Sequence, residues 1–148
     1  MGEFQVVVCQ LADECYGLDI GSVYEIIRFR GSTTVPASPA FVDGVINLRG
    51  RIIPVVDLAS RFGMSRGEAT KSTRIIVAET AGRRVGLVVD AVTEVFMLSD
   101  EAVEPTPDVA SGHDSTYIRG IAKLGEQLVI LLDLSALFSE QDAAQLAA

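Results

Sequence analysis

The sequence of 148 residues contains one histidine, two cysteines and no tryptophan. Structural zinc sites take four Cys, His or carboxylate ligands, and one histidine with two cysteines supplies few of them. The sole histidine, His113, is also far along the chain from Cys9 and Cys15. A disulfide between the two cysteines is not expected in a reducing cytosol. We interpret both as small apolar strand residues on either side of a turn over 12–14.

Long apolar runs are also missing. Asp57 and Asp133 interrupt the longest ones, so none approaches the roughly 20 residues of a membrane-spanning helix. The apolar run over 4–9 is too short for the hydrophobic region of a signal peptide. We therefore expect a cytoplasmic protein with no direct insertion into a membrane.

Basic residues are few for a nucleic-acid-binding protein. The chain has 12 Lys and Arg against 20 Asp and Glu, a formal net charge of −8. Basic patches supply most of the affinity for nucleic acid, so we expect no nucleic-acid partner. An acidic surface does not oppose a protein partner that carries basic residues.

Catalytic motifs are absent as well. The sequence has no phosphate-cradling Gly-Lys motif and no dinucleotide fingerprint. His113, Asp114 and Ser115 are adjacent, so their side chains cannot easily align as base, orienting group and nucleophile. We expect no enzyme, no cofactor and no metal.

One pattern does occur twice. GVINLRGRIIPVVDLASRF, from Gly44, aligns without a gap with GIAKLGEQLVILLDLSALF, from Gly120. Upstream, YGLDIGSVYEI, from Tyr16, aligns with VGLVVDAVTEV, from Val85. The segments keep the same order, which indicates an internal duplication. Each half is near the lower size limit for a core of its own, so we expect the halves to share a hydrophobic interface.

Apolar runs bounded by turn residues predict mostly strands. In the first half we expect them over 4–11, 16–20, 23–29, 44–48 and 51–58, and the same cycle repeats in the second half. Pro54 cannot donate a ladder hydrogen bond, so we expect it on an edge strand or at a bulge.

Five strands per half fit two small barrels. Asp57 and Asp133 each precede a short apolar-periodic stretch and are interpreted as helix N-caps. The second stretch predicts an amphipathic C-terminal helix. The expected fold is all-β: two packed five-stranded barrels within one domain over 1–148, with 1–66 forming the first barrel and 67–148 the second barrel and the helix.

Two other functions remain as alternatives. Asp57 ends an apolar strand, as the phosphoacceptor of a response-regulator receiver does, but receivers alternate strands with long helices. Because Asp133 repeats Asp57, a shared cap explains the position better, and a receiver-like phosphoacceptor is the remote alternative. The second alternative function is the binding of a small molecule inside a barrel, although five-stranded barrels are normally filled by side chains.

The duplication also singles out a turn residue. Asn47-Leu48-Arg49-Gly50 in the first half matches Lys123-Leu124-Gly125-Glu126 in the second. A turn that accepts Gly125 does not need Arg49 for its geometry. Arg49 is therefore either a contact residue, since Arg is favoured at interfaces, or an ordinary exposed turn residue. Glu25 is repeated by Glu94, which leaves room for a role in the fold.

These segments carry a family resemblance. FVDGVINLRGRIIPVVDL, YGLDIGSVYEI and RRVGLVVDAVTEV together resemble the CheW family of chemotaxis coupling proteins, over nearly the whole chain. The resemblance implies two SH3-like barrels with a C-terminal helix, in agreement with the expected strand count.

The resemblance also implies a function. Such proteins are adaptors without catalysis that join the cytoplasmic tips of transmembrane chemoreceptors to the regulatory domain of the histidine kinase CheA. They are expected to be monomeric when free and to form rings within receptor arrays. A related adaptor of twitching motility or another chemosensory pathway is the closest alternative. Carried over by motif, the receptor contacts are Val23, Glu25, Arg49 and Gly50, while the kinase contacts cannot be placed by residue.

Overall fold

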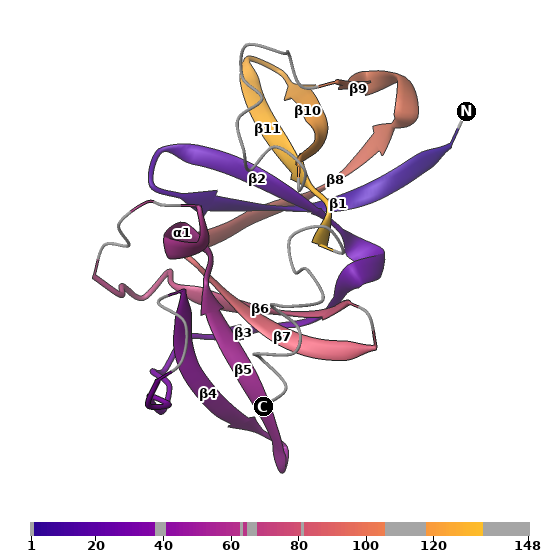
Figure 1. Ribbon diagram of the computed structural model, residues 1–148. Helices are drawn as coiled ribbons and strands as arrows, with labels where there is room; N and C mark the ends of the chain where they lie inside the picture. The colour runs from indigo at the N-terminus through magenta and orange to yellow at the C-terminus, as the bar shows by residue number, and fades with distance from the viewer. Residues whose placement is uncertain are drawn as a thin grey trace.

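The computed structural model describes residues 2–37, 41–62, 64, 68–80, 82–105 and 118–134. These residues form two antiparallel-rich sheets that lie one above the other in Figure 1. The all-β fold is confirmed, and each sheet is built largely from hairpins.

The five-stranded sheet lies below in Figure 1. Its strand order is β3-β6-β7-β5-β4. The bounds are β3 (Val23–Arg28), β4 (Val42–Leu48), β5 (Arg51–Asp57), β6 (Arg74–Thr80) and β7 (Arg83–Val89). A four-residue helix, α1 (Leu58–Arg61), follows β5.

The six-stranded sheet has the order β8-β1-β2-β11-β10-β9. The bounds are β1 (Glu3–Leu11), β2 (Glu14–Asp19), β8 (Ala91–Ser99), β9 (Val103–Glu104), β10 (Ile118–Leu124) and β11 (Gln127–Leu132). Two 3-10 turns, η1 (Ile20–Ser22) and η2 (Asp100–Ala102), follow β2 and β8.

The two sheets do not coincide with the two halves of the sequence. The β1–β2 hairpin lies between β8 and β11, which belong to the second half. In return, the β6–β7 hairpin lies between β3 and β5 of the first half. The expected division into a barrel over 1–66 and a barrel over 67–148 therefore differs from the structure, because the two repeats exchange their first hairpins.

The duplication is visible in the register of the strands. Gly17 in β2 lies opposite Leu131 of β11, and its counterpart Gly86 in β7 lies opposite Val55 of β5. A Cβ at Gly17 would lie only 2.8 Å from Leu131 Cδ2, and one at Gly86 only 2.7 Å from Ile75 Cγ2. Both glycines therefore let neighbouring side chains pack directly onto the backbone.

The hydrophobic core joins the two sheets. Its largest cluster combines Val7 and Leu18 of the six-stranded sheet with Val56, Leu87 and Leu58 of the five-stranded sheet and α1. Each sheet also encloses a smaller cluster of its own. Such burial is the main source of stability in a domain of this size, and the expected shared interface is present.

Cys9 and Cys15 are free thiols and both are buried. Cys9 lies opposite Tyr16, and Cys15 lies opposite Gln10, so the two thiols are one pair apart in the hairpin. They pack into different core clusters. Burial raises the pKa of the Cys9 thiol to about 12, which leaves it protonated and unreactive at neutral pH.

Asp57 caps α1, as expected. It is 8% exposed, and its carboxylate accepts hydrogen bonds from the Ser60 backbone N–H at 3.4 Å and from the Ser60 hydroxyl at 3.1 Å. Asp133 stands at the equivalent place before Leu134, and the C-terminal helix expected after it lies outside the described residues.

We predict that Asp57→Ala lowers the free energy of unfolding by about 0.5–2 kcal/mol, the usual cost of a lost N-cap. Urea denaturation followed by circular dichroism measures this change. Asp57→Ser, which retains a capping oxygen, should recover part of the loss, and equal stability of Asp57→Ala and wild type would show that the cap is dispensable.

The position of Pro54 was predicted only in part. It lies in β5, which is flanked by β7 and β4, so it is not on an edge strand. It pairs with Val45 of β4, while the ladder with β7 begins at Val55. The proline thus occupies a place where β5 has a neighbour on one side only, which tolerates its missing N–H.

Candidate functional site

The turn between β4 and β5 has two residues, Arg49 and Gly50. Their φ angles are 52° and 86°, the pattern of a type I′ hairpin turn. The Asn47 side-chain oxygen accepts a hydrogen bond from the Gly50 N–H at 2.9 Å. Arg49 therefore holds a left-handed backbone conformation that a glycine would adopt more easily.

The second repeat builds this turn differently. Between β10 and β11, Gly125 has a φ of 66°, and Glu126 has no positive φ. The strained position is thus occupied by glycine in one repeat and by arginine in the other. An arginine kept at a backbone cost, where the fold accepts glycine, favours a role for its side chain.

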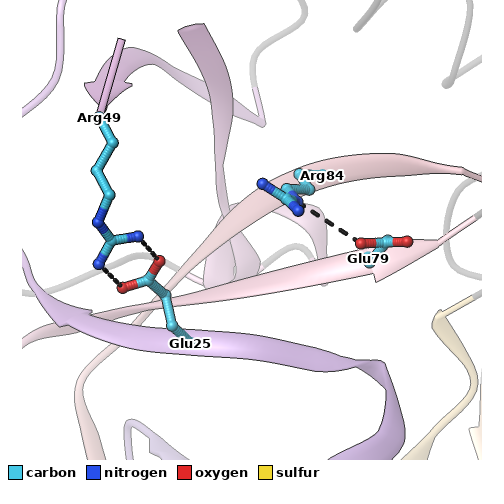
Figure 2. A network of polar contacts seen from close by, with 4 residues as sticks. All are labelled: Glu25, Arg49, Glu79 and Arg84. Atoms are coloured by element: carbon cyan, nitrogen blue, oxygen red, sulfur yellow. Dashed lines mark hydrogen bonds and ion pairs between the residues drawn. The ribbon is translucent and has the colours of Figure 1, made fainter. Parts of the chain in front are cut away.

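The Arg49 side chain forms a bidentate ion pair with Glu25. Nη1 donates to Oε1 at 2.5 Å and Nη2 donates to Oε2 at 2.9 Å. Figure 2 shows Arg49 reaching from the β4–β5 turn down to Glu25 on β3. The Arg49 side chain is 68% exposed and that of Glu25 is 20% exposed, so the guanidinium remains accessible to a partner.

This ion pair connects the two edge strands of the five-stranded sheet. Glu25 lies on β3 and Arg49 directly follows β4, and these strands stand at opposite ends of the strand order. The pair therefore spans the gap between the two edges of this sheet. In the second repeat, Glu94 is exposed and Gly125 has no side chain, so this contact has no counterpart there.

A second group of polar contacts lies beside the first. The Arg84 guanidinium stacks over the Tyr24 ring at 3.8 Å from its centroid, and Arg84 Nε lies 3.6 Å from Glu79 Oε2. Figure 2 shows the Arg84–Glu79 pair on neighbouring strands next to the Arg49–Glu25 pair. Tyr24 is 49% exposed, so this face of the sheet offers both an aromatic ring and charge.

The four residues carried over by motif do not have equal surroundings. Glu25 and Arg49 contact each other, and Gly50 is exposed beside Arg49. Val23 is only half-buried and packs against the large core cluster, which favours a role in the fold. The structure brings three of the four together at the accessible end of the barrel.

Two exposed residues of β3 were missed. Tyr24 and Ile26 point outward, at 49% and 38% exposure, while Val23, Glu25 and Ile27 are more buried. Val23, Ile26 and Ile27 are apolar without strict alternation, so composition alone does not separate the exposed isoleucine from the more buried one. The signal was available in the period-2 pattern of a strand with one face inward.

The hydrogen bond to Arg49 lowers the pKa of Glu25 below its ordinary value of 4.5. A carboxyl group whose pKa is depressed by folding stabilises the folded state above its ordinary pKa, and this contribution disappears as the pH falls through the folded value. The ion pair is therefore complete at neutral pH and opens only in acid.

We predict that the Glu25 carboxyl carbon titrates below pH 4.5 in the wild-type protein and returns toward its ordinary value in Arg49→Gly. Carbon-detected NMR of the side-chain carboxyl groups measures both titrations. An unchanged Glu25 titration in Arg49→Gly would contradict the ion pair.

Within the described ranges, no three His, Cys, Asp or Glu side chains are grouped so that they could hold a metal ion. In the same ranges, no helix is long and apolar enough to cross a membrane. The expected linker over 99–115, with His113, Asp114 and Ser115, lies mostly outside the described residues.

Comparison with known proteins matches residues 5–142 to the CheW-like domain family. A "Probable chemotaxis protein CheW" of Rhizobium etli is 38% identical over 142 residues, which cover 96% of this chain and 92% of the relative. The "Chemotaxis protein CheW" of Thermotoga maritima is 36% identical over 138 residues, or 93% and 89% of the two chains.

A solved structure has the same fold. The scaffolding protein TtCheW from Thermoanaerobacter tengcongensis superposes with a TM-score of 0.86 at 40% identity, covering 96% of this chain and 92% of that one. The family match extends over both repeats and the turn that carries Arg49. The chain described here therefore belongs to the CheW-like domain family.

Proposed function

We propose that this chain is a non-catalytic adaptor that links the cytoplasmic tips of chemoreceptors to the regulatory domain of the histidine kinase CheA. Family membership and the names of its relatives support the chemotaxis role. The chain would work from the cytoplasm and join receptor arrays at the membrane through its partners. An adaptor of twitching motility or another chemosensory pathway would use the same fold.

The observation that supports a receptor site best is the placement of Arg49. Its side chain is exposed, is held in position by Glu25, and stands where the second repeat has glycine. A pre-oriented guanidinium binds a partner's carboxylate or carbonyl at little cost in side-chain entropy. We propose that Glu25, Arg49 and Gly50 contact the receptor, with Val23 supporting β3 beneath them.

Calorimetric titration with the cognate CheA regulatory domain tests the kinase arm of the proposal. We expect a dissociation constant in the micromolar range, or about −8 kcal/mol, weak enough for exchange. Repeated contacts of this strength are sufficient to build a ring. No heat of binding at high protein concentration would count against the adaptor role.

Incubation with phosphorylated CheA tests the absence of catalysis and phosphotransfer. We expect no label on this chain, because Asp57 is buried and caps α1. Label that appears on the chain and is lost in Asp57→Asn would support the receiver-like alternative instead.

A further inference from the structure

The five-stranded sheet contains a hollow between its edge strands. Its volume is about 450 Å³, and it lies between β3, β4 and the connection over 30–33. A backbone bridge of Thr33 to Val45, with hydrogen bonds of 2.8 and 2.9 Å, connects the 30–33 segment to β4 at one end. Beyond the other end, the Arg49–Glu25 ion pair connects the turn after β4 to β3. The hollow thus lies between these two contacts, at the edge-strand side of the five-stranded sheet.

The floor and the rim of this hollow differ in chemistry. Ile27, Ile46 and Leu48 line it and pack against the buried cluster that includes Ile75. Arg28 and Arg30 stand on its rim and are exposed. An apolar floor below cationic side chains suits an occupant with an apolar group and negative charge.

The charges of the two rim arginines are available to a partner. In the described part of the chain neither Arg28 nor Arg30 has an ion-pair partner. The surroundings are basic too, since residues 23–89 hold ten of the 12 basic residues but only five of the 20 acidic ones. The stretch of chain that forms the hollow therefore carries a net positive charge within an acidic protein.

The duplication shows that the fold does not need these arginines. When the alignment of Val23 with Val92 is extended, Arg28 pairs with Met97 and Arg30 pairs with Ser99. Both counterparts lie on β8, the equivalent edge strand of the six-stranded sheet. Basic residues that occur in one repeat only, at an opening into the barrel, have the character of a binding site.

We infer that this hollow binds a short acidic segment of a partner protein, which inserts one large apolar side chain onto the isoleucine and leucine floor and places carboxylates on Arg28 and Arg30. The volume suits a few side chains, and charge-assisted hydrogen bonds from guanidinium to carboxylate would fix the segment. A nucleic acid fits less well because its backbone offers nothing to the apolar floor and the protein as a whole is acidic.

This site goes beyond the proposed receptor contact. Glu25, Arg49 and Gly50 do not line the hollow, so a segment can bind there with the ion pair intact. Binding in the hollow and receptor coupling at Arg49 can therefore be separated by substitution.

Amide NMR of the 148-residue chain tests the inference with the peptide acetyl-Glu-Glu-Leu-Phe-Glu-Glu-amide. We expect shift changes confined to β3, β4, residues 30–33 and the neighbouring Ile75 of β6, and these changes should weaken as salt is added. Two further probes serve as controls. The peptide acetyl-Glu-Glu-Ala-Ala-Glu-Glu-amide keeps the negative charge but lacks the large apolar side chains. A short DNA duplex supplies negative charge as phosphates. Both should bind at least about tenfold more weakly than the first peptide, since each lacks one of the two interactions.

The double variant Arg28→Glu/Arg30→Glu should lose about tenfold or more in affinity, the scale of two charge-assisted hydrogen bonds. Lys71→Glu is the matched control, because Lys71 is exposed on the same basic part of the chain and does not line the hollow. It should bind the peptide as wild type does. The inference would be overturned by shift changes elsewhere in the protein or by no binding at millimolar peptide. It would also be overturned if the alanine peptide bound equally well, if the protein preferred DNA, or if Lys71→Glu lost as much affinity as the double variant.

Discussion

Gly44→Ala is expected to lower the free energy of unfolding by about 3 kcal/mol, at the upper end of single substitutions. A Cβ at Gly44 would collide with the backbone carbonyl of Thr33 and lie 2.6 Å from the Ser32 hydroxyl oxygen. The colliding carbonyl belongs to the backbone bridge between Thr33 and Val45, so it cannot withdraw without breaking that bridge. Urea denaturation measures the loss.

Gly50→Ala is the matched control. Gly44 and Gly50 both have a positive φ, 156° and 86°, but a Cβ at Gly50 would meet nothing within 4 Å. Only the backbone conformation is strained, at about 1–2 kcal/mol. Gly120, the counterpart of Gly44, repeats the close approach, since its Cβ would lie 2.8 Å from the Glu104 carbonyl oxygen. A Gly44→Ala protein as stable as Gly50→Ala, or more so, would contradict this account of the duplicated glycine.

Arg49→Gly is expected to leave folding intact and to weaken receptor coupling by about tenfold or more, the scale of hydrogen bonds to a charged group. Glycine suits the φ of 52° at this position and is the residue that the second repeat uses. The midpoint of thermal unfolding should therefore equal or exceed that of wild type. Co-sedimentation with membranes that contain the receptor measures the coupling.

Arg51→Gln controls for the loss of a positive charge near the turn. Arg51 is exposed at the start of β5, and Gln127 stands at the equivalent place in β11. This variant should sediment with receptor as wild type does. An Arg49→Gly protein that unfolds early, or that still binds receptor at full strength, would show that Arg49 is an ordinary turn residue.

The duplicated pattern predicted much of the fold because each repeat fixes its own hairpins. Strand positions and the shared interface follow from apolar and turn residues that are close in sequence. The N-cap at Asp57 likewise follows from its neighbours in sequence. The exchange of hairpins does not follow. The β1–β2 and β6–β7 hairpins have similar patterns, so each could pair with the neighbours of either repeat, and only the complete three-dimensional packing selects between them.

The candidate site shows a similar division. The contrast between Arg49 and Gly125 pointed to the turn, because an alignment of repeats separates what the fold needs from what it does not. The partner of Arg49 was beyond sequence reasoning, since Glu25 is 24 residues away and meets it only where β3 and β4 close the barrel. The total charge did not single out the rim arginines of the hollow, because the exchange of hairpins decides which charged residues share a sheet.

Kinase activity in a reconstituted system tests the central claim most directly. Receptor-containing membranes and CheA are assayed for CheA autophosphorylation without this chain, with the wild-type chain, and with Arg49→Gly. We predict that receptors control CheA only when the wild-type chain is present, and that Arg49→Gly still binds the CheA regulatory domain but restores little of this control. Receptor control of CheA that is equally strong without the chain would contradict the adaptor function.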